Sequence, residues 1–283
     1  VFDAQGHMLA STEAGWTEQQ PQDWWAGLGA AVRGALSEAG VSSSDIETLK
    51  LTLPLRPGPT SSQGEAVKRL ILPGSGREVF VEPSVLAADV GALSAAAREM
   101  SLAGATWTHV DVGDGSVQAG RQLTSLGPSS VAAIRAAAPN VKIDVHLYTL
   151  DPEAHIETLI KAGADRITFQ IEHLEGSPDI ERRAFELARA IHAAGALAGV
   201  CLAPHTPLSA IDSLVAAGLV DLVDVLAVLP GIGGQTFRPE TLDKVRALRS
   251  AHPELPYLMV DGGVDANTCP LVAAAGANVV VSG

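Results

Sequence analysis

Histidine and aspartate residues recur where apolar runs end in the second part of the chain. His109 and Asp111 are two residues apart in one run, His146 ends another, and Asp261 ends a third, just before two glycines. Residues i and i+2 of a strand point to the same side. If these strand ends meet at one edge, two imidazoles and two carboxylates converge. Such a set suits one divalent ion: Zn²⁺, Fe²⁺, Mn²⁺ or Co²⁺.

A structural interpretation of the same residues must be weighed against the metal. A single histidine or aspartate on a strand is more often a satisfied structural group than a ligand. Burying four such groups together without a counter-ion would cost much free energy, and this favours a metal centre. Asp144 shares a face with His146, and we interpret it as an acceptor that orients a ligating imidazole.

A second set of residues suits an anion. Closely spaced glycines let backbone N–H groups approach an anion, and a helix that starts after them adds its positive end. One such run alone is as often a simple turn, but three at adjacent strand ends predict a phosphate site. The candidates are Gly231, Ile232, Gly233 and Gly234 in the run PGIGGQTF, Gly262 and Gly263 in VDGG, and Gly283.

The elements that must position these residues alternate regularly from residue 78 onward. Apolar strand-like runs are followed by Ala-rich helical stretches, and five of these end in Ala-Gly, as at Ala103-Gly104. A glycine beyond a helix adopts the left-handed conformation at little cost. Helices between strands imply parallel pairing, and eight such units favour a (β/α)8 barrel over an open doubly wound sheet. Strands are expected at 78–83, 105–112, 141–147, 164–171, 196–202, 219–228, 256–262 and 277–283.

The domain organisation follows from a change of pattern. We predict an N-terminal fragment at 1–49, a Pro-, Gly- and Ser-rich linker at 50–78, and the barrel at 79–283. The chain stops after the eighth strand, so the last helix of the barrel is missing. Either the sequence is cut there, or an amphipathic helix at 22–39 covers the exposed flank; the first is the simpler interpretation.

Composition excludes several classes of partner. The net charge is −13 and no block of Lys or Arg occurs, which argues against nucleic acid but permits a small anion at a local site. The aliphatic stretch 214–229 is interrupted by Asp221 and Asp224, so no membrane span is expected. Cys201 and Cys269 read as buried core thiols of a reducing compartment, which predicts a cytoplasmic protein. The number of subunits stays open, a homo-oligomer included.

Several motifs in one order resemble a known family. Residues 82–283 resemble the ribulose-phosphate 3-epimerase family, except for its last helix. The resemblance implies a (β/α)8 barrel that interconverts ribulose 5-phosphate and xylulose 5-phosphate at C3. The motifs are PSVLAAD (83–89), HVDV (109–112) followed by Asp114-Gly115, DVHL (144–147), PGIGGQTF (230–237) and VDGG (260–263).

The same resemblance implies roles for individual residues. It makes Asp111 the proton acceptor, Asp261 the proton donor and Ser84 a substrate contact, and it assigns the metal to His109, Asp111, His146 and Asp261. His146 then also lies beside the substrate. Inversion of a carbon next to a carbonyl needs a base on one face and an acid on the other, while a Lewis acid stabilises the enediolate oxygens.

The sequence departs from the family around the reacting carbons. The family usually has Met where Gly113, Tyr148 and Leu226 stand, and Asn where Leu229 stands. The loop 116–126 also lacks the usual apolar-Pro-Asn run. We expect the reaction type to survive and the substrate, a pentulose or hexulose phosphate, to stay open. A non-catalytic barrel that binds sugar phosphates is the alternative.

Two further residues could contact the substrate. We interpret Tyr148 and Arg121 as solvated surface residues instead.

Residues 1–49 have a resemblance of their own, to the start of carbohydrate kinases of the ribulokinase and xylulokinase type. Because the catalytic Asp and the second lobe of such kinases are absent, no kinase activity is expected.

Overall fold

The computed structural model describes residues 70–71, 78–117, 126–230 and 234–283. The kinase-like fragment 1–49, the helix expected at 22–39, most of the linker and Arg121 lie outside these residues. Their interpretation therefore stays a prediction.

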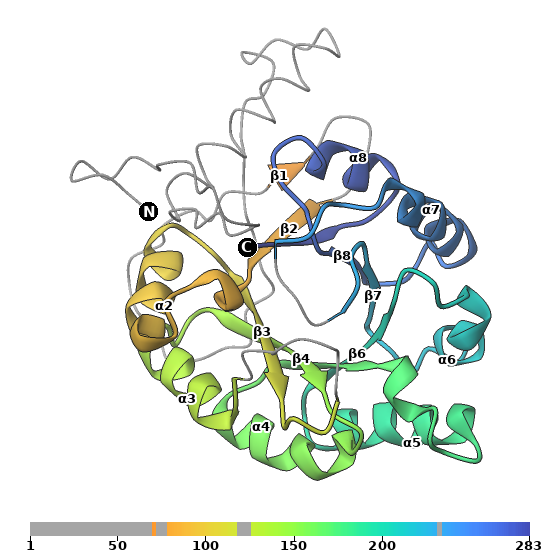
Figure 1. The fold of residues 1–283 in the computed structure, drawn as a ribbon, viewed down its shortest axis with the longest axis horizontal. Helices are drawn as coiled ribbons and strands as arrows, with labels where there is room; N and C mark the ends of the chain where they lie inside the picture. Colours follow the sequence, from red (N-terminus) through yellow and green to blue (C-terminus); the bar gives the residue numbers. More distant parts are fainter. Residues whose placement is uncertain (1–69, 72–77, 118–125, 231–233) are drawn as a thin grey trace, which may run out of the picture.

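Eight parallel strands form the ring in the centre of Figure 1, and each pairs with the next along the chain from β3 to β9. β9 then pairs with β2, and a parallel bridge from Ser84 to His109 joins β2 to β3. The prediction of a (β/α)8 barrel is confirmed. The strands are β2 (Glu78–Pro83), β3 (Trp107–Gly113), β4 (Lys142–Tyr148), β5 (Arg166–Gln170), β6 (Leu197–Leu202), β7 (Leu222–Leu226), β8 (Tyr257–Asp261) and β9 (Val279–Ser282).

Helices connect these strands and surround the ring. As the Ala-Gly pairs predicted, the glycines that follow α2, α4, α5, α6 and α8 all have positive φ, with values between 64° and 116°. The helices are α2 (Leu93–Leu102), α3 (Pro128–Ala137), α4 (Ile156–Ala162), α5 (Ile180–Ala193), α6 (Asp212–Ala216), α7 (Leu242–Ala251) and α8 (Cys269–Ala274). None of the helices that the structure describes is long and apolar enough to cross a membrane.

Within the predicted linker the structure describes one short element. β1 (Leu70–Ile71) pairs antiparallel with β2, with Leu70 opposite Val79 and Ile71 opposite Glu78. This part of the predicted linker therefore extends the sheet beside the first barrel strand.

Two apolar layers hold the barrel together. The larger layer lies between the strands and the helices and includes Leu258 and Val260 of β8. The smaller layer fills the barrel interior, where Leu222, Met259 and Val279 pack together. The alternation Leu258, Met259, Val260 shows the reason: successive side chains of a strand point to opposite faces.

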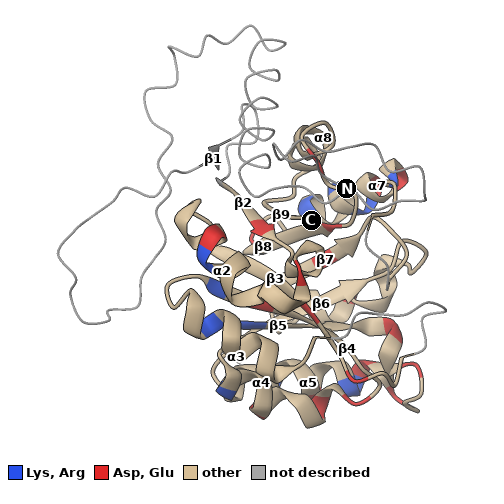
Figure 2. Ribbon diagram, turned by 60° about the vertical axis from the view of Figure 1, so that its left-hand side comes forward, with Lys and Arg blue, Asp and Glu red and all other residues tan. Residues whose placement is uncertain are grey.

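The barrel interior also contains charged residues. Acidic and basic segments lie on the strands in the middle of the molecule as well as on the outer helices (Figure 2). Glu82, Asp144, Arg166 and Asp224 are fully buried on four different strands. Each of these charges needs a partner, since burying an unpaired charge is costly. Glu82, Asp144 and Arg166 are partners of one another below the candidate site.

Candidate active site

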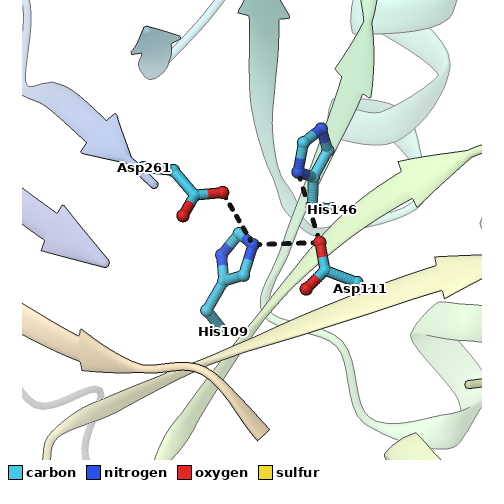
Figure 3. A group of neighbouring side chains, drawn as sticks. All are labelled: His109, Asp111, His146 and Asp261. Atoms are coloured by element: carbon cyan, nitrogen blue, oxygen red, sulfur yellow. Dashed lines mark ion pairs between the residues drawn. The ribbon is translucent and has the colours of Figure 1, made fainter. Parts of the chain in front are cut away.

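The four predicted ligands lie at the carboxyl ends of three strands. His109 and Asp111 point inward from β3, and Asp111 lies opposite His146 of β4 in the strand register. Asp261 ends β8 and enters from across the barrel. Figure 3 shows the four side chains pointing toward one another, with Nε2 of His109 between the two carboxylates.

The distances between these groups fit a single small cation. His109 Nε2 lies 3.5 Å from Asp111 Oδ1 and 3.7 Å from Asp261 Oδ2, and His146 Nδ1 lies 3.6 Å from Asp111 Oδ1. Bonds of about 2.0–2.2 Å in a tetrahedral site put neighbouring ligand atoms about 3.3–3.6 Å apart. One ligand atom from each of the four residues lies within 4.8 Å of the others. Small shifts would complete the coordination.

Hydrogen bonds orient His109 for this use. Its Nδ1 lies 2.9 Å from Asp144 Oδ2, and a carboxylate can only accept, so the Nδ1 proton is donated to Asp144. In the neutral imidazole the lone pair is then on Nε2, which has no hydrogen-bond partner within the described part of the chain. This is the bond that the sequence analysis expected Asp144 to make to an imidazole.

His146 is oriented through its other ring nitrogen, Nε2. Its Nε2 lies 3.0 Å from Gln170 Oε1, and the Gln170 amide nitrogen donates to Glu172 Oε2 at 2.6 Å. The amide oxygen of Gln170 therefore faces His146 and accepts its Nε2 proton. Nδ1 is left with a buried lone pair and no hydrogen-bond partner among the residues described. Two unpartnered imidazole nitrogens that both face the Asp111 carboxylate fit a cation between them.

A buried ion-pair chain supports Asp144 from below. Arg166 Nε donates to Asp144 Oδ1 at 2.8 Å, and its Nη2 donates to both oxygens of Glu82 at 2.6 and 2.7 Å. The guanidinium carbon lies 4.4 Å from the Trp107 ring centre, a cation–π contact. Burial alone would raise the pKa of Asp144, but Arg166 and His109 hold it well below its usual range. Asp144 therefore stays an ionised acceptor.

Glu82 and Arg166 were not predicted from the sequence. Each is a charged residue at an inward position of the strand alternation. That signal was visible in the sequence, but the contact between the Glu82 and Arg166 side chains across the barrel was not.

The two carboxylates at the mouth differ in proton affinity. Burial raises the pKa of Asp261 to about 6, with His109 opposing the shift and the charge of Asp111 adding to it. Burial also acts to raise the pKa of Asp111, but His109 outweighs it and the pKa falls below its ordinary value. The protein groups alone thus favour an ionised Asp111 beside a more readily protonated Asp261. An acid and a base drawn from one residue type need such a difference.

The candidate phosphate residues lie at one corner of the barrel mouth. Ser84 donates its backbone N–H to Ser282 O at 2.9 Å, and a Cβ at Gly283 would approach Ser84 Cβ to 3.3 Å. Gly262 has φ +101°, and a Cβ there would lie 2.3 Å from Val228 Cγ2, so only glycine fits. Gly263 and Gly234 also have positive φ. Gly231, Ile232 and Gly233 lie outside the described residues.

The interpretation of Tyr148 as a solvated residue was wrong. Its side chain is buried, and its ring centre lies 4.3 Å from that of His146 and 5.6 Å from that of His173. The reason is the strand alternation, because Tyr148 continues the inward series of Asp144 and His146 by one further step. Tyr148 thus covers His146 from the mouth side.

The fold and the position of this site define a (β/α)8-barrel enzyme, since such enzymes carry their active sites at the carboxyl ends of the strands. The ribulose-phosphate 3 epimerase family matches residues 80–283, and the chain belongs to this family. It is therefore an isomerase of the epimerase type that acts on carbohydrates.

Curated relatives agree over most of their length. The ribulose-phosphate 3-epimerase of Synechocystis sp. is 39% identical over 210 residues, which cover 73% of this chain and 86% of that protein. That of Bacillus subtilis is 36% identical over 209 residues, covering 72% and 90%. Among solved structures, the deoxyribose phosphate aldolase of Aeropyrum pernix has a TM-score of 0.52 at 20% identity, covering 71% of this chain and 84% of that one. This last likeness concerns the fold alone.

Proposed function

We propose that this chain interconverts ribulose 5-phosphate and xylulose 5-phosphate by inverting C3. The observation that carries the proposal is the placement of Asp111 and Asp261 on either side of the His109 Nε2 atom, 3.5 and 3.7 Å from it, with opposite pKa shifts. The relatives that the chain resembles are named for this reaction.

In the proposed reaction Asp111 removes the proton from C3 of ribulose 5-phosphate. The electron pair of the C–H bond forms the C2–C3 double bond, and the C2 carbonyl becomes an enediolate oxygen. Asp261 donates its proton to the other face of C3, which restores the carbonyl and gives xylulose 5-phosphate. Each positioned acid or base accelerates such a reaction by about 10²–10⁴-fold. Proton exchange with water then returns both carboxyls to their starting states.

One divalent ion would be held by His109, Asp111, His146 and Asp261. Zn²⁺, Fe²⁺, Mn²⁺ and Co²⁺ are all compatible with nitrogen and oxygen ligands. Such an ion would act as a Lewis acid and stabilise negative charge on the substrate oxygens. Asp144 and Gln170 hold the two imidazoles in the tautomers that ligation requires.

The phosphate group would lie at the corner formed by Ser84, Gly262, Gly263 and Gly283, together with the run 231–234. Backbone N–H groups without side chains around them can approach an anion closely there. The partner is thus a small ketose phosphate. A location in the cytoplasm stays a prediction, and the number of subunits stays open.

A hexulose phosphate is the second candidate substrate. Gly113 ends β3 two residues beyond Asp111, opposite Tyr148, and it adds no side chain over the reacting carbons. The family usually has Met at this position, and the smaller residue would suit a longer sugar.

The test is a panel of ketose phosphates with each of the four metals, followed by NMR of the products. We expect conversion of ribulose 5-phosphate to its C3 epimer, and loss of conversion with a chelator. Conversion of only hexulose phosphates would favour the second candidate. Tight binding of all substrates without conversion would instead favour a non-catalytic barrel.

A further inference from the structure

Asp224 is a buried carboxylate that the proposed reaction does not use. It is an inward residue of β7 and lies opposite Cys201 of β6 in the strand register. Its side chain is fully buried, and neither of its oxygens has a hydrogen-bond partner of ordinary geometry in the described part of the chain. The thiol of Cys201, a weak donor, is its polar neighbour.

The two other carboxylates that are fully buried, Asp144 and Glu82, accept hydrogen bonds. Asp144 accepts from His109, Arg166 and Thr168, and Glu82 accepts twice from Arg166. An unsupported buried carboxylate is costly, so Asp224 must bind either a proton or a cation. From the sequence, Cys201 was interpreted only as a core thiol, and Asp224 was not placed in a site.

The surroundings of Asp224 favour a cation. A carboxylate oxygen of Asp224, the Cys201 sulfur and an imidazole nitrogen of His146 all lie within 4.8 Å of one another, and all three residues are buried. Zinc takes sulfur at about 2.3 Å and nitrogen or oxygen at about 2.0–2.2 Å, which sets ligand atoms about 3.3–3.7 Å apart. The ligand atoms of the three side chains therefore need to approach one another by about 1.5 Å at most.

We propose that Asp224, Cys201 and His146 form a second cation position, deeper in the barrel than the centre of His109, Asp111 and Asp261. The thiolate makes this position selective for thiophilic ions such as Zn²⁺, Co²⁺ or Cd²⁺ over Mn²⁺. His146 belongs to both groups of candidate ligands. A thiophilic ion at the deeper position therefore competes with the upper centre for His146.

Binding at this position is coupled to protons. Burial raises the pKa of Asp224, with the charge of Asp261 adding to it, and burial likewise raises the pKa of the Cys201 thiol. A cation must displace these protons, so affinity should rise with pH. The proposal does not depend on the epimerase reaction, and its test needs no substrate.

The test is a titration of the full chain with Co²⁺ and Cd²⁺, monitored by thiolate-to-metal charge-transfer absorption in the near ultraviolet. We expect a band in the wild type that is lost in Cys201→Ser and needs at least ~10-fold more metal in Asp224→Asn, the loss typical of a removed metal-site group. Cys269→Ser is the matched control, since Cys269 is also buried but lies in α8 outside the barrel interior. It should retain the full band.

One measurement on the wild type decides the question even if a variant does not fold. Cadmium NMR should give a resonance in the range of sulfur-containing ligand sets. A resonance typical of nitrogen and oxygen ligands alone, or a charge-transfer band that survives Cys201→Ser, would overturn the proposal.

Discussion

Asp144 Oδ2 and His109 Nδ1 lie 2.9 Å apart inside the barrel, and this contact joins the buried ion-pair chain to the candidate metal centre. The other oxygen of Asp144 accepts from Arg166, which also binds both oxygens of Glu82. The orientation of one proposed ligand thus depends on residues from three further strands.

Asp144→Asn should weaken metal binding without removing a ligand. An asparagine amide can donate to His109 Nδ1, and the imidazole then places its proton on Nε2, where the lone pair is needed. Loss of such an orienting group typically costs about 10–100-fold in metal affinity, which competition with a chromogenic chelator would measure. Asp165→Asn is the control, because Asp165 pairs with Arg135 away from the site. Equal affinity in Asp144→Asn and wild type would contradict this account of the bond.

Arg166→Met should destabilise the barrel strongly. The substitution leaves Glu82 and Asp144 buried without their cation, and breaking one side of a buried pair costs about 3–5 kcal/mol. Urea unfolding measures this loss. In the matched control Arg182→Met, the exposed pair with Glu186 is removed, and the change should stay below about 1 kcal/mol. Equal losses of unfolding free energy in the two variants would show that the buried ion pairs of Arg166 stabilise the barrel no more than an exposed pair does.

The free energy of unfolding of the metal-free protein should carry a pH dependence from Asp261. Its pKa in the folded protein is raised to about 6, so the folded state binds more protons than the unfolded state between the ordinary value near 4 and pH 6. The contribution of Asp261 to the free energy of unfolding therefore falls as pH rises from about 4 to 6, by about 2–3 kcal/mol at most.

The comparison with Asp261→Asn isolates this effect. Glu82 and His146 also titrate between pH 4 and 7, but both are present in both proteins. Relative to the asparagine variant, the wild type should lose stability from pH 4.5 to 7 with chelator present. Parallel stability curves for the two proteins would show that the pKa of Asp261 is not raised.

Gly262→Ala should destabilise the mouth of the barrel. The residue has φ +101°, and the added Cβ would lie 2.3 Å from Val228 Cγ2. Left-handed strain and the overlap together should cost about 2 kcal/mol or more. At Gly176 a Cβ meets nothing within 4 Å and φ is not in the left-handed range, so Gly176→Ala should stay within about 0.5 kcal/mol. Thermal unfolding of both variants checks the difference, and equal melting temperatures would refute it.

Much of the fold followed from local patterns. The run EVFVEP coincides with β2, and the other strands overlap the predicted runs, because β-rich runs bounded by turn residues determine strands locally. The four side chains of the candidate centre could be located because i and i+2 spacing fixes their face and the barrel brings strand ends together.

The features that could not be predicted depend on contacts between residues that are distant in the sequence and on where strands end. Glu82 and Arg166 are 84 residues apart, and nothing local links them. Tyr148 was misjudged because a tyrosine after a strand is equally consistent with surface exposure, whereas the strand in fact continues to that residue. Asp224 was taken only as a charge that interrupts an apolar stretch, although its inward position on β7 makes it part of the interior.

The most direct test of the central claim is solvent deuterium incorporation at C3 of ribulose 5-phosphate, compared between Asp111→Asn and Asp261→Asn at equal metal content. With Asp261→Asn, Asp111 still removes the proton and returns a deuteron to the same face, so we predict deuterated ribulose 5-phosphate without xylulose 5-phosphate. With Asp111→Asn, both exchange and conversion from this substrate should fall by about 10²–10⁴. Full exchange in Asp111→Asn, or full conversion in Asp261→Asn, would contradict the assignment of base and acid.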